Sequence, residues 1–312
     1  MVRFVVKRIL LVIPTVLAVV LVMYFIMDLT PSDPATLILG ERATQEKIDE
    51  LNEELGYYDP FVVRYVRYIG DALQGDLGNS WVSGRSVFDE IVQRFPVTAK
   101  LALGAVIIAI LIGLPIGILS AVKQYSIFDV LGTTFAMTLA SVPGFWLGMM
   151  LIVLFAQQLN LLPSFGADTW KHFILPCLAA ASGMIATQLR MGRTSMLESI
   201  RMDYIRTARA KGQKERLVVM RHALKNALLP IITVTGMDFG YLLGGAVVIE
   251  TVFSLPGIGT LLIEAIRGKD IPVVLGTMMV LVVCFAFVML LVDLLYAFVD
   301  PRIKARYVKS RH

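Results

Sequence analysis

The sequence predicts an all-α membrane protein with six transmembrane helices and a small helical extracytoplasmic domain after the first of them. Of its 312 residues, 57% are hydrophobic and only 17% are charged, and the mean hydropathy is +0.73. A soluble domain carries about 25% charged residues, so the composition excludes a soluble protein and, over most of the length, a disordered chain. The apolar residues also form long uncharged runs, as membrane-spanning helices do.

Six runs are long enough to cross a bilayer, which takes about 20 apolar residues. The first is interpreted as a retained span, because it is too long for a signal peptide and the segment after Met27 offers no small-residue cleavage site. The third is predicted to be one long span to about residue 159. The predicted spans cover residues 9–27, 101–122, 130–159, 173–189, 226–249 and 271–299.

The distribution of cations predicts the orientation. With the N-terminus inside, the inner segments hold 19 of the 29 Lys and Arg residues, so both termini and the loop between the fourth and fifth spans are expected in the cytoplasm. The chain is therefore divided into an N-terminal tail with the first helix, an extracytoplasmic helical segment, a permease core with its cytoplasmic loop 190–227, and a cytoplasmic tail. These divisions are 1–29, 30–97, 98–300 and 301–312.

The outer segment is too long for a simple loop and is predicted to be folded. Its apolar spacing indicates helices over 41–55, ending at Gly56, and over 61–73, ending before Gly75. Binding a delivery partner and covering the ends of the membrane helices are both compatible with this segment.

No enzymatic constellation is present in the sequence. The three histidines, His172, His222 and His312, lie on different segments, so neither a metal triad nor a Ser/His/Asp set can be drawn. No Walker-type phosphate loop occurs. Cys177 and Cys284 both lie in apolar runs and predict buried free thiols. We expect no catalysis and no cofactor bound by this chain.

Small residues recur every four positions in three spans, a spacing that lets helix backbones approach closely in lipid. Packing within the chain is the simpler interpretation, and the three-glycine ridge in the fifth span also suits a mobile or intersubunit surface. Pro115 and Pro143 predict kinks. The spaced glycines are Gly113 and Gly117, Gly144 and Gly148, and Gly236, Gly240 and Gly244.

Two carboxylates are candidates for lining a translocation pathway. Asp238 falls near the middle of the fifth span, where a charge normally faces a polar partner or a water-filled cavity. Glu250 and Asp293 lie nearer to span ends, where structural roles are favoured. For Asp238, a pathway role and structural pairing with another helix both remain open.

The cytoplasmic loop contains a short amphipathic helix over 203–212, with Gly212 suited to end it in a left-handed conformation. Ile205, Ala208 and Gly212 fall on one face, and Arg206 and Arg209 point elsewhere. The apolar face could dock into a groove on another protein. A basic helix on an anionic lipid surface is the alternative.

Beyond these patterns, the residues resemble a known family. The run 204–212 followed by 222–230 is similar to the cytoplasmic "EAA" loop of ABC-importer permeases of the peptide/nickel subfamily, which carries dipeptides, oligopeptides, nickel or glutathione. Segments 29–35, 75–80, 240–259 and 293–302 resemble other parts of the same subfamily in the same order. Arg206-Thr207-Ala208 stands where the general ABC-permease motif has Glu-Ala-Ala, so the contacts of that glutamate are not assigned to Arg206.

This resemblance implies a permease with the type I ABC-importer fold in a bacterial inner membrane. It implies a heterodimer with a second homologous permease, two ATPase subunits that bind ATP and Mg, and an extracytoplasmic binding protein; no nucleic acid is expected, and lipid surrounds the spans. The helix that would couple to an ATPase comprises Asp203, Tyr204, Ile205, Arg206, Thr207, Ala208, Arg209, Ala210, Lys211 and Gly212.

Peptides are the first expectation for the cargo, with nickel, a nickel chelate and glutathione as alternatives. Residues 162–172 somewhat resemble glutathione and nickel members. A secondary transporter is the competing class, but the sequence shows no half-to-half repeat of the kind that such carriers contain.

Overall fold

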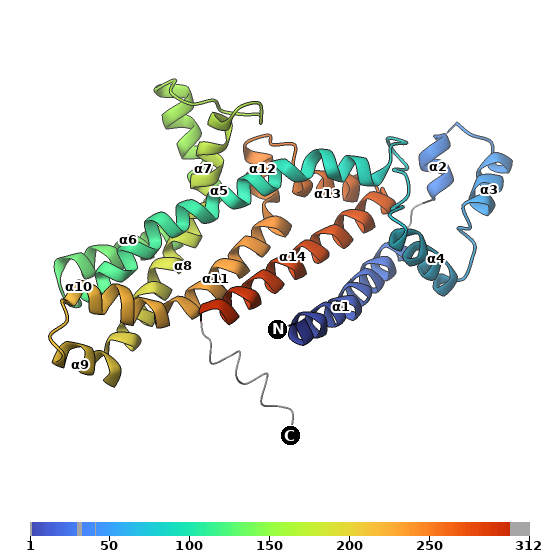
Figure 1. Cartoon of the computed structure of the whole chain (residues 1–312). Helices are drawn as coiled ribbons and strands as arrows, with labels where there is room; N and C mark the ends of the chain where they lie inside the picture. Colours follow the sequence, from blue (N-terminus) through green and yellow to red (C-terminus); the bar gives the residue numbers. More distant parts are fainter. Residues whose placement is uncertain (1, 30–32, 41, 300–312) are drawn as a thin grey trace.

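The computed structural model describes residues 2–29, 33–40 and 42–299, and it is built from helices (Figure 1). Within those residues the only strand-like pairing is an isolated bridge between Asn79 and Ser86. The α-helices are α1 (Val2–Asp28), α2 (Pro34–Leu39), α3 (Gln45–Glu54), α4 (Phe61–Leu73), α5 (Val87–Val122), α6 (Ile127–Ser141), α7 (Gly144–Leu151), α8 (Ile174–Ile200), α9 (Asp203–Ala210), α10 (Glu215–Leu217), α11 (Leu224–Gly245), α12 (Val247–Val252), α13 (Ile258–Arg267) and α14 (Ile271–Val299).

Five of these helical stretches are long and apolar enough to cross a membrane, and a sixth span results if the bent pair α6 and α7 is counted as one. Two π-helical segments, η1 (Ile152–Gln158) and η3 (Val218–Ala223), continue α7 and precede α11, and a 3-10 turn, η2 (Trp170–Phe173), precedes α8. The predicted all-α membrane fold is confirmed. The five spans are Leu10–Asp28, Val87–Val122, Trp170–Ile200, Glu215–Gly244 and Ile271–Tyr296.

The third predicted span is broken near its middle, and its second half ends at Gln158, close to the predicted end at about residue 159. The chain bends by 95° between α6 and α7, at Val142 and Pro143. Proline has no N–H to continue the helix and disfavours helical geometry in the residue before it, and Val142 is extended accordingly, with φ −92° and ψ 121°. The predicted kink at Pro143 is therefore present, and it is sharp enough to divide the span. α5 continues as one helix through Pro115.

The core of the bundle is the contact between α5 and α8. A Cβ atom on Gly113 would lie 2.7 Å from the Ile185 carbonyl oxygen, and one on Gly117 would lie 2.5 Å from that of Leu189. Only glycine permits this approach of two backbones. α11 and α14 run alongside this pair (Figure 1).

The outer segment contacts the end of the first span, where Arg64 pairs with Asp28, and the start of the last, where Ser80 donates to Asp270. Helix α4 has the predicted bounds 61–73, and α3 begins at Gln45 inside the predicted 41–55. The second span starts much earlier than predicted, because α5 begins at Val87. The segment α2–α4 and the short helix α9 lie at opposite ends of the long helices (Figure 1), so they face opposite sides of a membrane that these helices cross.

Candidate coupling surface and membrane polar cluster

Helix α9 is a short helix with well-defined ends. Met202 is extended, with ψ 150°, and Asp203 places a carboxylate in the first turn, where it complements the helix dipole. At the other end Gly212 has φ +73°, its N–H donates to the Arg209 carbonyl, and the N–H of Gln213 donates to the Ala208 carbonyl. These two bonds form a Schellman motif, so the left-handed conformation predicted for Gly212 is confirmed.

The apolar face of α9 is turned into the protein. Ile205 is 0% exposed and Ala208 is 7% exposed. They belong to a buried cluster that we call the α9 seat, to which α5, α8, η3 and α11 all contribute. Its residues are Ala121, Met196, Ile205, Ala208, Val218, Val219, Ala223 and Ala227.

The expectation that Ile205 and Ala208 present a docking face to another protein is therefore wrong. An isolated helix of eight residues is unstable in water, and burying its apolar face against its own chain provides the stabilisation that it lacks. Gly212 is exposed.

The outward surface of α9 remains available to a partner. We call it the coupling surface; it consists of the exposed residues Asp203, Tyr204, Arg206, Thr207, Arg209, Ala210, Lys211 and Gly212. Arg209 donates two hydrogen bonds to Glu215, at 3.0 and 2.6 Å, and Tyr204 accepts one from Asn226 at 2.8 Å. These bonds fasten the coupling surface to the start of the fifth span.

Asp238 lies in a polar cluster between α8 and α11. Gln188 is fully buried, donates to Thr235 Oγ1 at 2.8 Å, and also hydrogen-bonds Asp238. Within the described residues, the buried atoms Asp238 Oδ2 and Gln188 Oε1 have no hydrogen-bond partner. Both are acceptors, so the cluster has capacity for a donor from outside the chain, such as water or an ammonium group.

Glu250, the second pathway candidate, has its hydrogen-bond partners elsewhere, on α5 and α13. It is fully buried and accepts hydrogen bonds from Thr98 Oγ1 at 2.5 Å and from the Thr260 N–H at 2.9 Å. The second of these is an unpaired N–H of the first turn of α13, so Glu250 caps that helix from a distance. Burial raises the pKa of this carboxyl, and the hydrogen bond from Thr98 opposes the shift.

The glycine ridge of α11 is used mainly inside the chain. A Cβ atom on Gly236 would collide with Val292, and one on Gly240 would lie 2.5 Å from the Phe285 ring, both on α14. Gly244 has nothing within 4 Å of such an atom and is exposed.

One charged pair, Arg193 with Asp129, was not predicted, because Asp129 lies just before the apolar run of the third span and has no neighbouring pattern that indicates a partner. Arg193 on α8 donates two hydrogen bonds to Asp129 on α6, at 2.6 and 2.8 Å. Gln188 was missed as well, because a neutral amide inside an apolar helix carries no signal of charge. Among the described residues no group of His, Cys, Asp and Glu is arranged to hold a metal ion.

Comparison with known proteins agrees with this architecture. Residues 113–305 match the family described as binding-protein-dependent transport system inner membrane component, and residues 1–102 match its N-terminal counterpart. The glutathione transport system permease protein GsiC of Salmonella paratyphi A is 42% identical over 97% of this chain and 99% of its own. The dipeptide transport system permease protein DppB of Alkalihalophilus pseudofirmus is 42% identical over 97% and 100%.

A solved structure shares the fold. The inward-facing MetNI methionine ABC transporter contains a chain that matches 67% of this one and 96% of its own length, with a TM-score of 0.57 and 19% identity. The long helices seen here are thus arranged as in an ABC importer.

Proposed function

Since the chain belongs to the family of binding-protein-dependent transport system inner membrane components, and is thus the membrane permease of an ATP-driven importer and not an enzyme, we propose that its cargo is a peptide. The observation that carries this proposal is the equal, nearly full-length similarity to a glutathione permease and a dipeptide permease. Glutathione is itself a short peptide, so one cargo class accounts for both relatives.

The partners follow from the family and from the charge distribution. A binding-protein-dependent permease works with an extracytoplasmic binding protein and with ATPases. In our proposal two ATPase subunits bind ATP and Mg, and a second, homologous permease completes the channel as a heterodimer. Positive residues concentrate on the side of α9, which supports a cytoplasmic position for α9 and for both chain termini.

The ATPase contact in this proposal is the coupling surface. Because Ile205 and Ala208 are buried in the α9 seat, a displacement of α9 by the ATPase is transmitted to the helices that form that seat. These are α5, α8, η3 and α11. The seat thereby connects nucleotide-driven movement to the membrane spans, in line with alternating access by movement of helix bundles.

The polar cluster is the proposed contact for the cargo. Asp238 and Gln188 present buried acceptor atoms without partners among the described residues. A peptide carries an ammonium group, which supplies three donors and a positive charge. Asp238 would thus lower the barrier for a cationic group in the membrane interior.

Uptake by the reconstituted importer tests the proposed cargo. The complex is assembled from this chain, its second permease, its ATPases and its binding protein, in vesicles loaded with ATP and Mg. We expect labelled dipeptide or glutathione to accumulate, and unlabelled peptide to compete. Accumulation of nickel ions without any peptide uptake would contradict the peptide proposal.

A further inference from the structure

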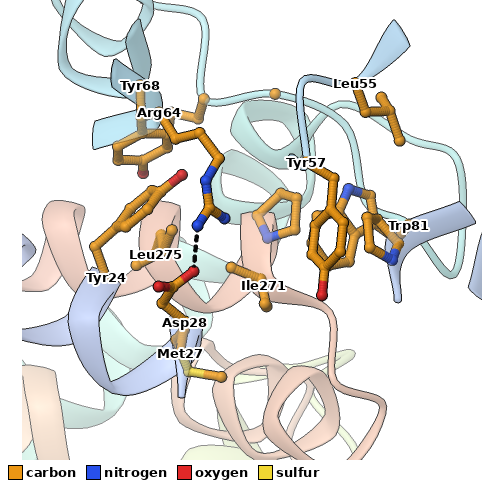
Figure 2. A pocket seen from close by; sticks show the side chains of 14 residues that line it. Tyr24, Met27, Asp28, Leu55, Tyr57, Arg64, Tyr68, Trp81, Ile271 and Leu275 are labelled. Carbon is orange, nitrogen blue, oxygen red and sulfur yellow. Dashed lines mark hydrogen bonds and ion pairs between the residues drawn. The ribbon is translucent and has the colours of Figure 1, made fainter. Parts of the chain in front are cut away.

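A cavity of about 190 Å³ lies where the outer segment meets the first and last spans. Its polar part holds the Arg64–Asp28 ion pair and Tyr68, and its apolar part includes Met27 and Leu275 (Figure 2). Asp28 ends the first span and Ile271, also in the lining, begins the last. The cavity is therefore located at the outer boundary of the membrane.

The polar part of the cavity offers hydrogen-bond donors to an anionic group and an acceptor to a cationic group. Nη2 of Arg64 donates a hydrogen bond to Asp28 Oδ1 at 2.6 Å, and its Nε donates one to the Asp59 carbonyl at 3.0 Å. These two bonds leave Nη1 available to a ligand. The hydroxyl of Tyr68 is buried and has no partner among the described residues. Figure 2 shows it beside Tyr24 and the ion pair. The second oxygen of Asp28 can accept from an ammonium group.

The surroundings are those of a lipid-facing surface. The first span is only 11% buried, and the Tyr65 hydroxyl reaches the Leu17 carbonyl inside that span at 2.9 Å. On α4, Val62 is 65% exposed and Val66 is 61% exposed. A helix with an apolar exposed face at this depth lies in the membrane interface, so the cavity opens next to lipid.

We propose that this cavity binds the headgroup of a zwitterionic phospholipid that carries a free ammonium group, such as phosphatidylethanolamine. Its phosphate accepts from Arg64 Nη1 and Tyr68 Oη, and its ammonium donates to Asp28. The acyl chains lie along the exposed face of α1. Because Arg64 and Asp28 neutralise each other, an anionic lipid gains less at Arg64 and is repelled by Asp28. This inference does not depend on which cargo is carried.

Native mass spectrometry of the purified complex tests the proposal, with lipids removed stepwise from protein supplied with equal phosphatidylethanolamine and phosphatidylglycerol. We expect one retained ethanolamine lipid, preferred by about tenfold since the contacts are charge-assisted. Arg64→Gln and Tyr68→Phe should abolish the preference. Tyr68→Phe keeps the ring and removes only an unpartnered hydroxyl, so its effect cannot come from misfolding.

Two further variants make the test specific. Arg67→Gln, on the same helix but outside the cavity lining, should retain the preference. Asp28→Asn leaves the charge of Arg64 uncompensated and should shift the lipid preference toward phosphatidylglycerol. Equal retention of both lipids by the unmodified complex would overturn the proposal, as would an unchanged preference in both cavity variants. When a dipeptide is added to the same preparation, its retention in place of the lipid would also overturn the proposal.

Discussion

The guanidinium group of Arg193 and the carboxylate of Asp129 meet through two hydrogen bonds of 2.6 and 2.8 Å, which join α8 to α6. The Asp129 side chain is 6% exposed and the Arg193 side chain is 26% exposed. Two short bonds from one guanidinium fix the orientation of both helices. Since α6 leads into the 95° bend, this pair holds one arm of the bend against the core of the bundle.

Removing the negative charge should therefore destabilise the permease. Asp129→Asn leaves the partly exposed guanidinium of Arg193 without its counter-charge, which costs about 1–3 kcal/mol for a pair between the exposed and the fully buried kind. We expect a lower unfolding temperature in detergent. Asp203→Asn is the control, because its pair with Arg206 is 3.5 Å long and exposed and contributes little. Equal unfolding temperatures for the two variants would contradict a structural role for the Asp129 pair.

Gly212→Ala should weaken attachment of the ATPases. The new Cβ has no atom within 4 Å, so the cost of about 1–2 kcal/mol arises from the positive φ alone. We expect less ATPase to co-purify and an intermediate loss for Gly212→Asn, which tolerates this conformation better. Gly70→Ala, which also meets open space but lies inside helix α4, should be neutral. Full ATPase recovery with Gly212→Ala would show that the end of α9 need not be held in place.

Asp238→Asn should change transport and leave assembly intact. The substitution keeps the shape of the side chain and removes the charge proposed to meet the cargo ammonium. Loss of one charge-assisted contact predicts roughly tenfold slower peptide uptake, with normal recovery of partner subunits. Unchanged uptake kinetics would instead assign Asp238 to pairing with Gln188.

Glu250 should make stability depend on pH. Its pKa is raised from 4.5 by burial, so the folded state holds the proton more tightly than the unfolded state. That stabilisation is complete below pH 4.5 and is lost as the pH rises through the raised pKa. Glu250→Gln should flatten the dependence of the unfolding temperature on pH in this range, whereas Glu264→Gln, at an exposed carboxylate, should not. An identical slope in the Glu250→Gln variant would disprove the assignment.

Periodicity and charge were enough to predict the approximate positions of the spans and the cap at Gly212, because both depend on local chemistry. The bend at Pro143 was predictable as a kink but not as a 95° turn, since the angle depends on how α7 packs against α8. The glycines show the same limit: their spacing indicates close packing, but only the structure reveals that Gly236 and Gly240 face α14.

The orientation of α9 could not be predicted from the sequence, for a physical reason. A short amphipathic face has the same pattern whether it packs on its own chain or on a partner. Ile205 and Ala208 could be assigned to the α9 seat only once η3 and α8 were placed beneath them. The role of Gln188 could not be predicted either, because it arises from the position of this residue opposite Asp238, which lies on another helix.

Cysteine cross-linking of the assembled importer tests the coupling surface most directly. The two native thiols are unsuited to compete, because Cys177 is buried and Cys284 is half-buried. Ala210 is exposed and Ile205 is fully buried, although both lie on helix α9. We predict that Ala210→Cys forms a cross-link with an ATPase subunit and that Ile205→Cys forms none. A cross-link from Ile205→Cys together with none from Ala210→Cys would contradict the account.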